Sequence, residues 1–164
     1  MAVKIDTSKI EAELKKRINT VLQTDAVKII KETEKKHVQS DVYGAYGPLH
    51  YGRRGEGGGL ASEGSMTVHA GDMEVAVINE ASFNNAYEFG RGFIPPPNYG
   101  NTLAELIEGG NGAGGHYNYP YESGSGSFLG ARPFVANTRE ELRSSGVLRD
   151  AIKSGLSGSG LNVV

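Results

Sequence analysis

One long segment, residues 8–38, constrains the fold more than any other part of the chain. Neither Pro nor Gly interrupts it, and apolar residues recur at the three- and four-residue spacing of one helix face. Ser8 and Glu11 have the spacing of a capping box, so we expect the helix to begin there. Charged side chains, Glu34 among them, fill the opposite face. The apolar positions are Ile10, Leu14, Ile18, Val21, Leu22, Ala26, Ile29 and Ile30.

A β-hairpin is predicted after this helix. Residues 65–70 alternate apolar and polar side chains, residues 73–79 are rich in β-branched residues, and Gly71-Asp72 lies between them as a turn. Because a two-stranded hairpin is only marginally stable alone, we expect it to pack on the long helix or to gain further strands. The face turned to the core is expected to carry Met66, Val68, Val75 and Val77.

A second long helix is predicted for residues 133–156. Pro133 suits the first helical position, where its missing N–H costs nothing. Gly146 costs roughly 1 kcal/mol relative to Ala inside a helix, and it predicts a kink or break. Residues 157–164 are rich in Gly and Ser, and we expect a flexible tail there. The buried face is expected to comprise Phe134, Thr138, Leu142, Leu148, Ala151 or Ile152, and Leu156.

Two Gly-rich stretches, residues 43–64 and 109–130, are predicted loops. Gly accepts unusual backbone angles but loses more entropy when it is ordered, so each loop needs a partner surface to hold it. Between the loops, Pro95-Pro96-Pro97 must be extended, and residues 102–108 predict one or two helical turns. The inward side chains of those turns are expected to be Leu103, Leu106 and Ile107.

These elements predict an α+β fold. A long N-terminal helix and a C-terminal helix would pack on a small antiparallel β-sheet that carries two long Gly-rich loops. A chain of 164 residues is long enough for one domain with its own core. We expect that single domain to span residues 1–156.

Charge and composition narrow the function classes. The net charge is −2 and the pI is near 6.1, so the chain lacks the strongly basic character of a free nucleic-acid-binding protein. It has no Cys, which excludes disulfides, thiolate chemistry and Cys-based zinc sites. No apolar run has the length of a membrane span, and residues 1–6 lack the apolar stretch of a signal peptide. We therefore expect a protein made and assembled in the cytoplasm, without a membrane partner.

No residue pattern predicts a catalytic, metal-binding or cofactor-binding site. No two of the histidines share a metal-ligand spacing, and no Gly-x-Ser-x-Gly elbow occurs. Residues 55–60 lack the Gly-Lys-Ser/Thr ending of a phosphate loop, and residues 110–115 lack the strand–turn–helix setting of a dinucleotide site. We expect no enzyme activity. The alternative is a small-ligand or nucleotide-binding enzyme, which a ligand-induced rise in thermal stability would reveal.

Aromatic and basic residues around the Gly-rich loops are the candidate contact residues. Tyr offers a large contact area with a polar tip, so tyrosines embedded in glycine suggest loops that order against a neighbour. An arginine pair repeated around a symmetric ring would concentrate positive charge near DNA in a channel. The alternatives are tyrosines that cover the domain's own helices and an ordinary loop charge pair. The candidate subunit or partner contacts are Tyr43, Tyr46, Tyr51, Arg53, Arg54, Tyr117, Tyr119 and Tyr121.

The start of the last helix carries a family resemblance. The stretch Gly130-Ala131-Arg132-Pro133-Phe134-Val135-Ala136, leading into an amphipathic helix, resembles the small neck or tail-completion proteins of long-tailed phages. In that family an Arg-Pro-Phe step commonly opens the final helix, after a turn-rich segment like residues 106–112. The order of elements is similar over about residues 8–156. The chain departs from the family at residues 51–54 and the glycines that follow, where many relatives have a compact Thr-Gly-x-Leu-Arg segment.

The resemblance implies a structural subunit of the virion neck, assembled in the host cytoplasm. Such a subunit forms a homo-oligomeric ring, a hexamer or dodecamer, that joins the head-side connector to the tail tube or its terminator, with DNA passing through the centre. Arg132, Pro133 and Phe134 would be its structural anchor, and the family brings no catalytic residues. A tail terminator or another tail-tube-capping protein is the alternative within the same class. A free DNA-binding protein is the alternative from another class, and steeply salt-dependent binding to duplex DNA would support it.

Overall fold

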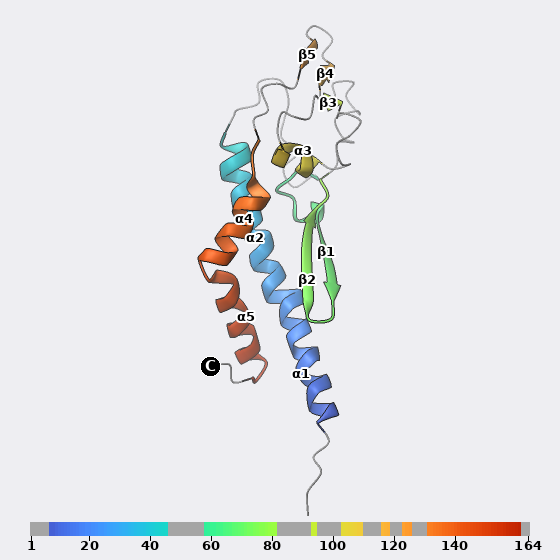
Figure 1. Ribbon diagram of the computed structural model, residues 1–164, viewed down its shortest axis with the longest axis vertical. Helices are drawn as coiled ribbons and strands as arrows, with labels where there is room; N and C mark the ends of the chain where they lie inside the picture. The colour runs from blue at the N-terminus through green and yellow to red at the C-terminus, as the bar shows by residue number, and fades with distance from the viewer. Residues whose placement is uncertain are drawn as a thin grey trace, which may run out of the picture.

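The computed structural model describes residues 7–45, 58–81, 93–94, 103–109, 116–118, 123–125 and 131–161. It confirms the α+β fold (Figure 1). A long N-terminal helix forms the central layer, a β-hairpin lies along one flank of it, and two C-terminal helices lie along the other.

The long helix extends further than the sequence pattern predicts. Two of its segments are π-helical turns, which insert an extra residue and rotate the side chains that follow. The predicted capping box is wrong: Thr7 is the N-cap, its side chain makes no capping hydrogen bond, and Ser8 is already helical. The consecutive segments are α1 (Ser8–Val21), η1 (Leu22–Ala26), α2 (Val27–His37) and η2 (Val38–Tyr43).

The hairpin consists of β1 (Met66–Gly71) and β2 (Glu74–Asn79), paired antiparallel. A 3-10 turn, η3 (Glu63–Ser65), leads into it. Val68 lies opposite Val77 in the register, on the same face as the buried Met66, so the predicted residues share one face. The prediction that all of them are buried is wrong for Val68, which is 37% exposed, while Val75 and Val77 are half-buried.

The turn of the hairpin lies one residue later than predicted, at Asp72 and Met73. Met73 adopts a φ of 57°, a left-handed conformation that is uncommon for a residue with a side chain. Its backbone N–H donates to Asn19 Oδ1 at 2.7 Å. Lys15 Nζ lies 3.0 Å from Asp72 Oδ2. The tip of the hairpin is thus fastened to α1.

A second antiparallel sheet has the strand order β3-β4-β5. It comprises β3 (Phe93–Ile94), β4 (His116–Asn118) and β5 (Ser123–Ser125). The segment 109–130, predicted to be loop throughout, therefore contains two short strands. Phe93 pairs with Tyr117, and such a distant partner leaves no local pattern in the sequence.

The predicted C-terminal helix is broken as expected, into α4 (Phe134–Ser144) and α5 (Val147–Gly158). Gly146 has a φ of 73° at the break, which glycine adopts without strain. The end of α5 is tied to the long helix, because Arg17 Nη1 donates to the Ser159 carbonyl at 2.6 Å. At Gly155 the two helices approach so closely that a Cβ there would lie 2.8 Å from Val21 Cγ1.

The apolar core lies where η2, α3 (Leu103–Gly109) and the first turn of α4 meet. Phe134 is completely buried there, and Ile107 points inward as predicted. For Leu103 and Leu106 the structure describes only the helical backbone, so the inward position of their side chains stays a prediction. The core cluster comprises Val38, Val42, Leu60, Ala61, Ala81, Ala104, Ile107 and Phe134.

Candidate functional site

Most of the predicted contact residues lie outside the part of the chain that the structure describes. This is true of Tyr46, Tyr51, Arg53, Arg54, Tyr119 and Tyr121, and for Tyr117 only the backbone, in β4, is described. Tyr43 is described: it ends the long helix, half-buried, and packs against the core cluster. For this tyrosine the structure favours the alternative role of covering the domain's own core. For the other residues the contact role stays a prediction.

The predicted anchor, Arg132-Pro133-Phe134, lies at the N-terminus of α4 and connects this helix to the core. The Arg132 N–H donates to the Ile107 carbonyl at 2.9 Å, so the step is tied to α3. Pro133 is the N-cap rather than the first helical residue, and its carbonyl accepts the Asn137 N–H at 2.8 Å. Phe134 has no exposed surface, which confirms it as the buried anchor.

Glu108 caps α4 from outside, and no sequence pattern identified it. Its two carboxylate oxygens accept the backbone N–H groups of Val135 and Ala136, at 2.9 and 3.0 Å. A carboxylate at a helix N-terminus satisfies free donors and suits the helix dipole. Because Glu108 belongs to α3, it fixes α4 relative to α3. Such a cap supplied from another helix has no local signature.

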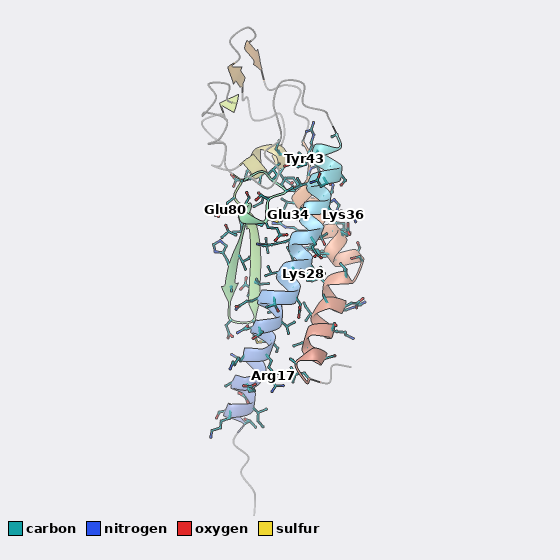
Figure 2. The ribbon with its side chains drawn as sticks, turned by 180° about the vertical axis from the view of Figure 1, so that it is seen from behind. Arg17, Lys28, Glu34, Lys36, Tyr43 and Glu80 are labelled. Carbon is teal, nitrogen blue, oxygen red and sulfur yellow. The ribbon has the colours of Figure 1, made fainter. Side chains whose placement is uncertain are left out.

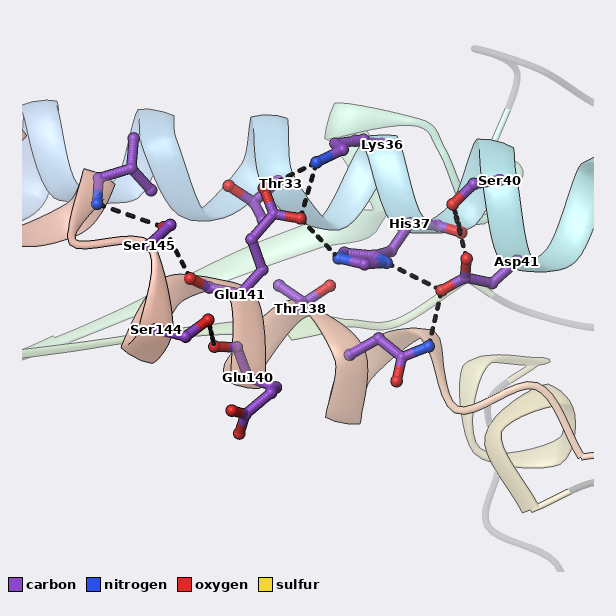
Figure 3. Close-up of polar contacts among 12 residues, drawn as sticks. Thr33, Lys36, His37, Ser40, Asp41, Thr138, Glu140, Glu141, Ser144 and Ser145 are labelled. Atoms are coloured by element: carbon purple, nitrogen blue, oxygen red, sulfur yellow. Dashed lines mark hydrogen bonds and ion pairs between the residues drawn. The ribbon is translucent and has the colours of Figure 1, made fainter.

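A cluster of polar side chains joins the long helix to α4 (Figure 3). His37 lies between two carboxylates: its Nδ1 is 2.8 Å from Asp41 Oδ2, and its Nε2 is 3.0 Å from Glu141 Oε2. Lys36 Nζ donates to both oxygens of Glu141 at 2.7 Å, and Asn137 Nδ2 donates to Asp41 Oδ2 at 2.9 Å. We refer to Lys36, His37, Asp41, Asn137 and Glu141 as the polar clasp.

The hydrogen bonds of the polar clasp are suited to holding α4 against the long helix. Both ring nitrogens of His37 lie within hydrogen-bond distance of a carboxylate, one on the long helix and one on α4. Ser40 Oγ donates to Asp41 Oδ1 at 2.6 Å, so the hydroxyl bonds to the acid and not to the imidazole that would activate it as a nucleophile. The cluster therefore ties α4 to the long helix.

The same contacts shift the acidity of the clasp. Partial burial acts to raise the pKa of Asp41, but hydrogen bonds from Asn137, Ser40 and His37 outweigh it and hold the pKa below its usual value. The hydrogen bond from Lys36 lowers the pKa of Glu141. Both carboxylates are thus held in the charged form that the clasp requires.

A buried polar link joins the long helix to the hairpin, and it corrects the expectation for Glu34. The sequence pattern placed Glu34 on the charged outer face, but the side chain is buried between α2 and β2 (Figure 2). Asn79 Nδ2 donates to Glu34 Oε1 and to the Leu60 carbonyl, both at 2.8 Å. Burial raises the pKa of Glu34. Glu34 lies four residues from both Ile30 and Val38, so ordinary helical spacing already places it on the same face as these apolar residues.

Two further observations concern what the described residues could hold. Within them, no group of three or more His, Asp or Glu side chains is arranged to bind a metal ion. Among the described helices, none combines the length and apolar character needed to cross a membrane.

Comparison with known proteins relates the chain to a phage-derived family. Residues 6–158 match the model of the YomN family. A relative in Bacillus subtilis (strain 168), the SPbeta prophage-derived uncharacterized protein YomN, is 33% identical over 133 residues, which cover 81% of this chain and 77% of the relative. No solved structure matches. The phage connection inferred from the sequence is thus confirmed at the level of a prophage-derived relative, and neither name assigns a place in a virion. The chain belongs to the YomN family.

Proposed function

We propose that this protein is a structural subunit of a phage neck, a tail-completion protein whose ring joins the head-side connector to the tail. It acts by packing against copies of itself and against its neighbours on the particle axis, and not by catalysis. The ring, a hexamer or dodecamer, surrounds the channel through which DNA passes.

One observation carries this proposal. The Arg132-Pro133-Phe134 step, on which the resemblance to neck proteins rests, has a structural role in this chain: it opens α4, and Phe134 is fully buried in the core. The prophage-derived relative, which matches 81% of the chain, supports a phage context for the same protein.

The fastening of the fold suits a load-carrying subunit. The hairpin is held to the long helix by the Glu34–Asn79 link and at its tip by Lys15 and Asn19. The polar clasp holds α4 on the opposite flank. Each flank is thus fixed to one central helix, and a rigid unit can pass force between neighbouring rings. The tyrosines and arginines of the Gly-rich stretches are the proposed contacts with those neighbours.

The proposal is tested by deleting the gene from the phage and imaging the particles. We expect filled heads and separate tails that do not join, and restoration of complete particles when the gene is supplied in trans. Antibody labelling of complete particles should mark the head–tail junction. A protein that is absent from particles, or that is labelled at the distal end of the tail, contradicts the proposal.

The same deletion distinguishes the alternative of a tail terminator or another tail-tube-capping protein. Loss of a terminator would leave tails of irregular length, whereas loss of a neck subunit leaves tails of normal length without heads. Measured tail lengths in the deletion lysate therefore decide between the two structural roles.

A further inference from the structure

The outer face of the hairpin is acidic and carries an exposed apolar side chain. In the register, Ile78 lies beside Thr67 and Glu74 beside Gly71, on the face turned away from Met66 and the long helix. Ile78 is 47% exposed, and Glu80, which accepts a hydrogen bond from Thr67, follows it at the same face. Residues 58–81 contain four carboxylates and neither Lys nor Arg. We define Glu74, Ile78 and Glu80 as the acidic face.

The outer face of the C-terminal helices has the opposite charge. Phe134, Thr138 and Glu141 turn inward to the long helix, which leaves Arg139 and Arg143 exposed on the far side of α4. On α5, Val147 is 37% exposed, and Lys153 is exposed six residues further along the helix. No ion pair joins Arg139, Arg143 or Lys153 to another residue in the described part of the chain. We define Arg139, Arg143, Val147 and Lys153 as the basic face.

The two faces lie on opposite flanks of the molecule. The hairpin packs on one side of the long helix, and α4 and α5 pack on the other (Figures 1 and 2). Each face combines an exposed branched apolar residue with an excess of one charge. On the acidic face the excess is negative. On the basic face three cations outnumber the exposed Glu140, which follows Arg139 in α4. Complementary charge across an interface orients the partners, and burial of Ile78 and Val147 would add a hydrophobic contribution.

We infer that a second copy of this chain covers the acidic face, by placing its basic face against the hairpin. This inference rests on the proposed function and names the surfaces through which its ring closes. A contact between two different faces is head-to-tail, and it closes into a ring when the rotation between copies allows. A two-fold contact of either face with itself would set like charges against each other. The covering copy also supports a hairpin that, within the described residues, pairs with no further strand.

Charge reversal on the full chain tests the interface. Glu74→Lys/Glu80→Lys makes both faces basic, and Arg139→Glu/Arg143→Glu makes both faces acidic. We expect each variant to weaken self-association at least tenfold, as measured by sedimentation velocity and native mass spectrometry. An equal mixture of the two should restore the wild-type ring mass with alternating copies, as should all four changes in one chain. High salt should weaken the wild-type assembly.

Matched controls lie on the open side of α2, away from both faces. Lys28 is exposed there, between the two flanks in Figure 2, and Glu32 follows it by one helical turn. Lys28→Glu and Glu32→Lys make charge changes of the same kind and should leave assembly unchanged. Circular dichroism of all variants should match the wild type, because every substituted side chain is exposed.

A cross-linking experiment tests the same interface in the case that rings form only inside phage particles. The chain has no Cys, so Glu74→Cys with Arg143→Cys introduces the only thiols. In purified virions, a short bismaleimide should produce a ladder that continues past the dimer. If both reversal variants still form rings of the wild-type mass, and the virions give no cross-linked ladder, the proposed interface is wrong. That result would not contradict the proposed function. A wild-type chain that neither self-associates nor enters virions contradicts the proposed function itself.

Discussion

The two halves of the long helix have the same amphipathic pattern but different surroundings. In α1, Ile10 is 63% exposed and Leu14 is 41% exposed, although both occupy the apolar face. Near the other end, Val38 and Val42 are almost completely buried among the residues of α3 and α4. The apolar pattern therefore identifies which face of a helix is suited to burial. It does not show along what length of the helix other parts of the same chain cover that face.

The difference follows from where the other elements end. The tip of the hairpin contacts α1 at Lys15 and Asn19, and the end of α5 contacts it at Arg17. The first turns of α1 extend past both contacts (Figure 1). Burial of apolar surface is the main favourable contribution to folding, so the stability of the domain should come mostly from the half of the helix that ends at Tyr43.

The largest effect is expected at the buried end, from Phe134→Ala. Removing a fully buried aromatic ring loses its transfer free energy and leaves a cavity, which costs about 3–5 kcal/mol. Little soluble protein should result, and chemical denaturation of what remains should show a lowered midpoint. Phe134→Leu keeps much of the volume and should lose clearly less. If the alanine variant were as stable as the wild type, Phe134 would not belong to the core that stabilises this half of the long helix.

A smaller loss is expected from Asn79→Ala, in the link between helix and hairpin. The change removes both hydrogen bonds of Nδ2 and leaves the Glu34 carboxyl buried without that donor. An unsatisfied buried polar group costs about 1–3 kcal/mol. Thr67→Ala removes an exposed hydrogen bond on the other face of the hairpin and should cost much less. Equal losses in the two variants, measured by urea denaturation, would show that the Glu34–Asn79 link contributes no special stability.

Gly155 marks the boundary between the two halves and gives a test of close packing. A methyl group there would crowd Val21 Cγ1 and the Asp25 carboxylate. The carboxylate can swing away, but Val21 is buried, so α5 would have to shift. We expect Gly155→Ala to lose about 1 kcal/mol, because the cost of overpacking exceeds the gain in helix propensity. Gly158→Ala, with nothing within 4 Å of its added Cβ, should instead gain slightly in melting temperature.

The sequence predicted the elements better than their contacts. The long helix, the hairpin, the break at Gly146 and the burial of Phe134 each depend on local spacing or on a single residue type. The hydrogen bond from Asn79 to the buried Glu34 and the cap from Glu108 depend on residues that are distant in the sequence. The pairing of the short strand β4 with β3, through Phe93, also depends on a distant partner, whereas β4 and β5 form a local hairpin. Local periodicity contains no information about such partners.

The polar clasp predicts a modest dependence of stability on pH. Asp41 and Glu141 have folded pKa values below their unfolded values of about 3.9 and 4.3, so their contribution is complete above that range and is lost as the pH falls through the folded values. Asp41→Asn/Glu141→Gln should therefore flatten the acid side of a plot of melting temperature against pH. Glu34→Gln should not flatten the acid side of that plot. Burial raises the pKa of Glu34, so the contribution of this carboxyl to stability is present at low pH and is lost as the pH rises. An unchanged acid side in the double variant would show that the clasp does not contribute.

The smallest effect is expected at the exposed end, from Leu14→Ser or Ile10→Ser. Substitutions at exposed positions away from caps and buried groups usually change stability by no more than about 0.5 kcal/mol. Urea denaturation of the isolated chain should therefore give midpoints close to the wild type. A loss above about 1 kcal/mol would mean that part of the same chain outside the described residues covers the first turns of α1. The two halves of the helix would then differ in which segment covers them, and not in whether they are covered.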